Sequence, residues 1–212
     1  MRFLHWPGQQ GFKERIGLSL IFLLFFYAFY GGAAVVADFI PWRFQVGFEF
    51  EKKIPFIPES ALIYLSLTGL MILALFVVRQ FSHLKRLVSI LCIQTTVAAV
   101  CFVLIPVENN FPVRPIGDIT YIFLLADAVN LTNNEVPSLH VCFAFTLAAV
   151  TAHYGQLWQR ILLLIWSVAI AISTMTMHEH NLIDLLGGII LSGWGVMKWR
   201  HHLASDDLQD SL

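Results

Sequence analysis

The stretch STMTMHEHNLID, residues 173–184, ends one apolar run and opens the next. Within it His180 and Asp184 are four residues apart. If the segment after His180 is helical, this interval puts both side chains on one face, where the carboxylate accepts the imidazole N–H and leaves the other ring nitrogen free. Such a pair is the core of an activated nucleophile or base. The alternative interpretation is the hydrated tip of a tight turn between two membrane helices.

The composition indicates a membrane protein. Of the 212 residues, 58% are hydrophobic and only 13% are charged, and the mean hydropathy is +0.72. Soluble domains are less apolar and carry about 25% charged residues. The net charge of −1 gives no reason to expect a nucleic-acid partner. The three cysteines lie inside apolar runs without metal-ligand spacing, so we interpret them as packing residues.

Six apolar segments approach or exceed the ~20 residues that a membrane-spanning helix needs. The sequence therefore predicts an all-α, polytopic membrane protein in which residues 1–204 form a single six-helix domain. A short interfacial helix is expected within residues 117–130, and residues 205–212 are expected to form a disordered acidic tail. The six predicted spans lie near residues 17–37, 61–78, 87–105, 139–154, 160–177 and 182–198.

The basic residues predict the orientation of these spans, because lysine and arginine gather on the cytoplasmic side. Nine of them flank the ends of the spans that share a side with both termini: Arg2, Lys13, Arg15, Arg79, Lys85, Arg86, Arg160, Lys198 and Arg200. Four lie on the other side: Arg43, Lys52, Lys53 and Arg114. Both termini are therefore predicted to be cytoplasmic. Residues 173–184 and the long loops 38–60 and 106–138 are predicted to face the periplasm or lumen.

A second polar motif, Pro137-Ser138-Leu139-His140, begins the fourth predicted span on the same outer side. A proline in the first turn of a helix leaves free backbone N–H groups beside Ser138, an arrangement that can hold an anion. His140, within one turn, can give a proton to a leaving oxygen. The alternative is that the motif only caps the helix.

Together the two motifs resemble the type 2 phosphatidic acid phosphatase superfamily of lipid phosphatases and phosphotransferases. That family has Lys-x6-Arg-Pro, Pro-Ser-x-His and Ser-Arg-x5-His-x3-Asp on a six-helix membrane core, and the resemblance runs over residues 114–188. It implies an enzyme without cofactor or metal, acting on a lipid phosphate at the outer membrane face. It makes His180 the nucleophile that forms a phosphohistidine, Asp184 its orienting carboxylate and His140 the general acid and base. The residues that it places on the phosphate oxygens are Arg114, Ser138, Ser173 and, at the position of an arginine, Thr174.

The sequence departs from the family pattern at two cationic positions. Val107 stands where the first motif has lysine, and Thr174 stands where the third has arginine. A phosphomonoester carries nearly two negative charges and a phosphodiester one, so a site with a single arginine suits a diester donor better. We therefore favour headgroup transfer, as in the inositol phosphorylceramide synthase and sphingomyelin synthase branches, to which the chain looks similar.

Other interpretations stay open at this point. The first is a phosphatase of the same superfamily that hydrolyses a phosphomonoester or pyrophosphate. The second is a transporter or proton-relay protein that titrates His140, His180 and Asp184, and the third is a membrane protein without activity. No zinc signature is present, so no metal is expected. Asp127 and Glu135 are read either as headgroup contacts or as hydrated loop acids. The sequence leaves open the donor, the acceptor, the membrane, the oligomeric state and the roles of His178 and Glu179.

Overall fold

The computed structural model describes residues 3–109, 111–112, 121–130 and 135–209. The described part is helical apart from one pair of two-residue strands, which agrees with the predicted all-α class. The helices are α1 Gly8–Asp38, α2 Ala61–Leu65, α3 Leu67–Val77, α4 Phe81–Leu104, α5 Tyr121–Val129, α6 Leu139–His153, α7 Leu157–Thr176 and α8 Leu182–Gln209. The strands are β1 Phe44–Gln45 and β2 Val107–Glu108, and two 3₁₀ turns span Glu51–Lys53 and Pro58–Ser60.

Within the described residues, five helical segments are long and apolar enough to cross a membrane, which is the pattern of an integral membrane protein. They are Gly8–Asp38, Pro58–Val77, Phe81–Leu104, Leu157–Thr176 and Leu182–Leu203. The prediction of six spans is not confirmed, because α6 has only 15 residues. At 1.5 Å per residue α6 is about 22 Å long, short of the ~30 Å hydrocarbon core. It packs instead in the middle of the bundle, against α3, α4, α7 and α8.

The second predicted span is interrupted between α2 and α3. Ser66 lies at the break, where its hydroxyl donates to the carbonyl of Ile63 and accepts the indole N–H of Trp166 at 2.8 Å. A serine that bonds to the preceding turn commonly bends a helix. The aromatic partner on α7 thus joins the α2–α3 break to α7, and the Trp166 ring lies against Gly69 of α3.

Two buried polar contacts hold the bundle together away from the loops. Gln94 on α4 donates to the hydroxyl of Thr146 on α6 at 2.9 Å, and Thr146 donates to Ser192 on α8 at 3.1 Å. Arg15 on α1 is 3% exposed and donates to the carbonyls of Leu75, Val78 and Arg79, each at 2.6 Å. Because carbonyls at a helix C-terminus lack helical partners, the guanidinium satisfies the end of α3 and ties it to α1.

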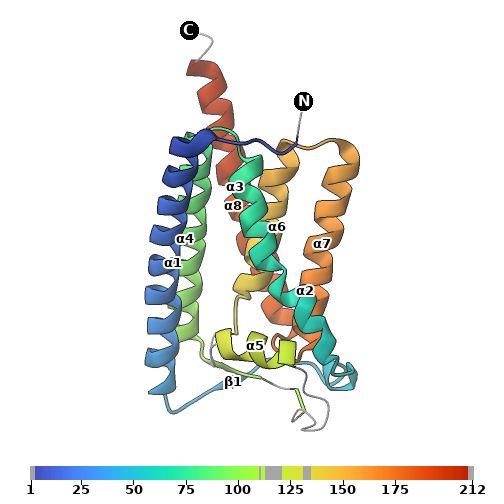
Figure 1. The fold of residues 1–212 in the computed structure, drawn as a ribbon. Coiled ribbons are helices and arrows are strands. Elements are labelled where there is room, and N and C mark those ends of the chain that lie inside the picture. Colours follow the sequence, from blue (N-terminus) through green and yellow to red (C-terminus); the bar gives the residue numbers. More distant parts are fainter. Residues whose placement is uncertain (1–2, 110, 113–120, 131–134, 210–212) are drawn as a thin grey trace.

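Helix α1 begins and helix α8 ends at one end of the bundle, while α5 and β1 lie at the other (Figure 1). At that second end β1 pairs in parallel with β2, with Phe44 opposite Val107, so the two long loops, 38–60 and 106–138, are joined by main-chain hydrogen bonding. Helix α5 occupies part of the segment 117–130 predicted to contain a short helix; residues 117–120 lie outside the described residues. Helix α8 continues through Gln209, into the segment expected to be a tail. The domain boundary at residue 204 and the orientation across the membrane stay predictions.

Candidate functional site

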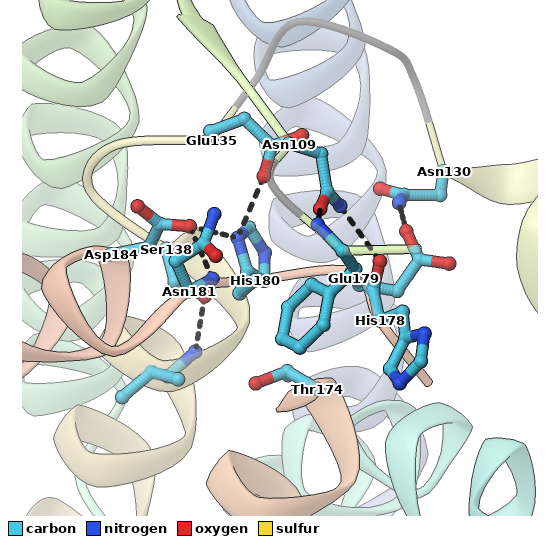
Figure 2. A network of polar contacts seen from close by, with 12 residues as sticks. Asn109, Asn130, Glu135, Ser138, Thr174, His178, Glu179, His180, Asn181 and Asp184 are labelled. Atoms are coloured by element: carbon cyan, nitrogen blue, oxygen red, sulfur yellow. Dashed lines mark hydrogen bonds and ion pairs between the residues drawn. The ribbon is translucent and has the colours of Figure 1, made fainter. Parts of the chain in front are cut away.

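His180 and Asp184 meet at the start of α8, where the local sequence builds a helix cap. Asn181 precedes the first helical residue, and the Asp184 carboxylate reaches back to accept the Asn181 backbone N–H at 2.8 Å. This is one half of a capping box, in which the third helical residue satisfies an N–H that the helix cannot. The cap holds the Asp184 Oδ2 atom 3.4 Å from Nδ1 of His180 (Figure 2). The pair is therefore together, as the sequence predicted, although His180 lies before α8 and the cap, not a shared helical face, joins the two side chains.

A second carboxylate faces the same imidazole nitrogen. Glu135, in the loop before α6, has its Oε2 atom 3.5 Å from His180 Nδ1 (Figure 2). Its side chain is 13% exposed, so it is packed against the histidine and is not a hydrated loop acid. Burial by itself lowers the pKa of His180, but Asp184 and Glu135 outweigh burial and raise it to about 10. Near neutral pH His180 is thus an imidazolium held between two carboxylates.

The Pro-Ser-x-His motif joins this pair through the main chain. Ser138 caps α6, its hydroxyl accepting the Val141 N–H at 3.4 Å. The Ser138 backbone N–H donates to the carbonyl of Asp184 at 3.0 Å, which brings the starts of α6 and α8 together. Gly188 permits this approach, because a Cβ there would lie 2.6 Å from the Ser138 carbonyl oxygen. The two motifs, some forty residues apart in sequence, are therefore adjacent in space.

His140 shares a cavity with His180. The cavity has a volume of about 150 Å³ and is lined by both histidines together with apolar residues of α1, α2, α3 and α6. The His140 ring stacks on Tyr64, with ring centroids 3.9 Å apart and planes 23° apart. Stacking fixes the plane of the imidazole, which a proton donor to a bound group needs. Both catalytic candidates thus border one space that a substrate can enter.

Three residues predicted to bind the phosphate oxygens are Arg114, Ser173 and Thr174. Arg114 lies outside the described residues. The hydroxyls of Ser173 and Thr174 are buried and donate to the carbonyls of Ile170 and Ala171, at 2.7 and 2.8 Å. Their oxygens can still accept hydrogen bonds, but both hydroxyl protons are already donated to carbonyls of α7. In this arrangement neither hydroxyl can donate to a phosphate oxygen.

The structure also gives Thr174 and Val107 roles in positioning the backbone. The carbonyl of Thr174 accepts the backbone N–H groups of Glu179 and His180, at 2.9 and 3.2 Å, and so shapes the turn that carries His180. Val107, at the family's lysine position, is 2% exposed and lies in β2. A residue buried in a strand pair contributes packing and no charge at this position.

His178 and Glu179, the two residues before His180, bind residues of the long loops. His178 has a positive φ of 56°, and its Nε2 atom lies 3.0 Å from the carbonyl oxygen of Ile54. Its ring stacks on Phe111 at 4.4 Å, and its carbonyl accepts the Asn109 amide at 2.7 Å. The Glu179 carboxylate accepts a hydrogen bond from Asn130, which follows α5 (Figure 2). These residues anchor three loop segments around the turn.

Glu51 is a site residue that sequence reasoning missed. It is fully buried, and its two carboxylate oxygens accept the backbone N–H groups of Leu182 and Phe48. A carboxylate at the first N–H of α8 is favoured by the positive end of the helix. Glu51 therefore fixes the first long loop to the helix that carries Asp184. An acid between the aromatic residues of a loop is the only sequence signal, and it does not name a partner.

The atoms of Glu135, His180 and Asp184 also have the spacing of a cation site, since their ligand atoms lie within 4.8 Å of one another. Those same atoms form the two ion pairs of the histidine. The imidazolium thus already occupies the ligand atoms of both carboxylates, and the absence of a metal requirement stays a prediction.

Comparison with known proteins gives one family. Residues 108–207, close to half of the chain, match the family model described as PAP2 superfamily. The matched stretch contains Ser138, His140, His180 and Asp184. No curated protein and no solved structure gives a significant match. Enzymes of this superfamily are lipid phosphatases and phosphotransferases that use a histidine nucleophile and need no metal.

Proposed function

We propose, with the PAP2 superfamily domain over residues 108–207 as the premise, that this protein is an integral membrane lipid phosphotransferase. The observation that carries the proposal is the meeting of three groups: His180 held at Nδ1 by two carboxylates, His140 on the same cavity, and the start of α6 bonded to the start of α8. A nucleophile, an orienting acid and a proton donor around one space are the parts that phosphoryl transfer through histidine requires.

In the first step the Nε2 atom of His180 attacks phosphorus, because Nδ1 is engaged by Asp184 and Glu135. The Nε2 lone pair becomes available when the imidazolium passes its Nε2 proton to His140 on the same cavity, and the Nδ1 proton stays toward the carboxylates. The bond from phosphorus to the leaving alcohol breaks as the P–N bond forms. His140 gives its proton to the leaving oxygen, so the alcohol departs neutral.

In the second step an acceptor alcohol attacks the phosphohistidine. His140, now without that proton, takes the proton of the attacking hydroxyl, and the P–N bond breaks to restore His180. With a lipid or headgroup alcohol as acceptor the result is headgroup transfer; with water it is hydrolysis. Which acceptor wins depends on how well the site excludes water.

The charge of the site favours a phosphodiester donor. The family's lysine and second arginine are replaced by Val107 and Thr174, and the structure adds the carboxylate of Glu135 beside the nucleophile. Each of these changes makes the site less positive. A dianionic monoester loses more from that than a monoanionic diester, because the repulsion grows with the charge of the ligand.

The test uses purified protein and two donors with the same acyl chains, phosphatidylinositol and phosphatidic acid, with a diacylglycerol or ceramide acceptor. We expect transfer of the phosphoinositol group to the acceptor and an acid-labile label on the protein that His180→Asn abolishes. Rapid release of phosphate from phosphatidic acid without headgroup transfer would assign the chain to the phosphatases of the superfamily. A protein that moves protons or solutes and never carries the label would be a transporter.

A further inference from the structure

The cavity that holds both histidines continues into a second one along the bundle. The second cavity, of about 160 Å³, is lined by α1, α3, α4 and Leu147 of α6. The two share Phe22, Leu23, Thr68 and Met71 in their walls, so they adjoin between α1 and α3. We call the combined space the α1–α3 groove. Beyond the histidines its lining is almost entirely apolar.

The packing of the helices explains why the groove exists. Helix α1 packs along α4, and α3 packs along α6, but α1 and α3 have almost no backbone contact with each other. Helices α4 and α6 therefore form the floor of the groove and α1 and α3 its two walls. The two walls stand apart in the view of the bundle in Figure 1.

The end of the groove away from the histidines is closed. There Arg15 ties α1 to the last carbonyls of α3, and Phe12 and Phe76 stack with Trp6 across the same two helices. The walls are pinned together at this end and separate toward the site. The groove is thus a blind slot with two imidazoles at its head.

We propose that the α1–α3 groove binds a single hydrocarbon chain of the substrate lipid and sets the chain-length preference of the enzyme. The proposal rests on the proposed function, because it puts the phosphate end of the lipid at His180. A ligand that is polar at one end and apolar along the rest matches a groove with two imidazoles at one end and apolar walls along its length.

The length of the groove supports a chain that stays within one leaflet. Its wall on α1 runs from Ser19 to Tyr30, a rise of about 16 Å along the helix at 1.5 Å per residue. Half of the ~30 Å hydrocarbon core is about 15 Å. A chain that fills the groove therefore reaches from the headgroup level to the bilayer midplane, which is the depth that it has in the membrane itself.

Leu23 is the residue that offers the sharpest test. It lines both cavities and is 41% exposed, so it stands at the rim where a chain would pass from the bilayer into the groove. The adjacent Leu24 is 74% exposed and lines neither of these two cavities. Leu23→Trp narrows the groove, and Leu24→Trp adds the same bulk to the lipid-facing surface. The two variants are matched in helix, residue type and depth.

The assay compares two phosphodiester donors with the same headgroup, one with long chains and one short-chained and water-soluble. We expect Leu23→Trp to lower kcat/KM for the long-chain donor by about tenfold or more, since displacing even two methylenes from an apolar site weakens binding by roughly that factor. The short-chain donor and Leu24→Trp should react as the wild type does. An unchanged long-chain rate in folded Leu23→Trp, or an equal loss with both donors, would overturn the proposal.

A second measurement does not depend on catalysis. A long-chain alkyl phosphate with a photoreactive diazirine at mid-chain is bound to the wild-type protein, irradiated, and mapped by mass spectrometry. Labels on Leu23 and Met71, lost in Leu23→Trp, support the groove even if no donor is turned over and the phosphotransferase proposal fails. Labels confined to the outward face of α1, at Leu20 and Leu24, would refute it.

Discussion

The ion pair between Glu135 and His180 leads to a prediction for Glu135→Gln. The two carboxylate oxygens lie 3.4 and 3.5 Å from Nδ1, and together they raise the pKa of His180 from 6.5 to about 10 against the opposing effect of burial. At nearly equal distances they share the effect about equally, so removal of one charge should lower the pKa by roughly 2 units, or about 2–3 kcal/mol. The amide keeps the shape of the side chain while removing the charge.

Two assays measure the lowered pKa of His180 in Glu135→Gln. Since attack needs the neutral imidazole, kcat/KM should rise with pH up to the pKa of His180, and in Glu135→Gln that rising limb should move about 2 units toward lower pH. Imidazole NMR signals of the protein in micelles should report the same shift directly. Glu59→Gln neutralises an exposed acid at the same end of the bundle and should leave both the pH profile of kcat/KM and the NMR titration unchanged. Coincident profiles for Glu135→Gln and the wild type would refute the charge argument.

The same shift predicts how stability depends on pH. The pKa of His180 in the folded protein lies above its unfolded value, so protonation stabilises the fold. This contribution is fully present below about 6.5 and disappears as the pH rises through about 10. We therefore expect the Tm in detergent to fall across this window. In Glu135→Gln the fall should be smaller and should end about 2 units lower. A Tm that does not change between pH 6.5 and 10 would contradict the assignment of the ion pairs.

Three further changes test the architecture of the site. Gly188→Ala puts a Cβ 2.6 Å from a backbone oxygen of α6 and should destabilise the protein by about 1–3 kcal/mol in thermal unfolding; Gly193→Ala, in open space, is the control, and equal Tm values for the two would contradict the close approach. Glu51→Ala leaves two backbone N–H groups without their carboxylate and should cost about 1–3 kcal/mol for each that stays buried, as measured by denaturant titration. Asp184→Asn should lower kcat by about 10²-fold or more while the slower label on His180 stays acid-labile; a wild-type kcat would remove Asp184 from the mechanism.

Local patterns were enough to predict the core of the candidate site. The interval from His180 to Asp184 predicts that the two side chains meet, and they do, but His180 precedes the first residue of α8 and the helix cap brings Asp184 to it. The apolar runs likewise predict the long helices, because burial in lipid or protein requires a continuous apolar stretch. One of the six predicted spans is not confirmed, because α6 has only 15 residues. This helix packs against α3, α4, α7 and α8, and the sequence does not state which helix is central.

Contacts between distant segments could not be predicted in the same way. Glu135 faces the nucleophile and Glu51 caps α8, but each is a single acid in a loop without periodicity. Nothing in the sequence distinguishes them from hydrated acids. Arg15 was counted as a topology signal, and its bonds to the end of α3 depend on how two helices meet. Pairings of this kind follow from the fold and become visible only with it.

The hydrogen bond from the Ser138 backbone N–H to the Asp184 carbonyl has a practical consequence. It uses no side chain, so we expect substitutions at His140 or His180 to leave this contact between the starts of α6 and α8 in place. Asp184 differs, because its carboxylate also caps α8. A histidine variant that loses activity has then lost a chemical group, while the starts of α6 and α8 keep their relative positions. Kinetic effects of substitutions at the two histidines can therefore be interpreted as chemistry, provided that Gly188 is left unchanged.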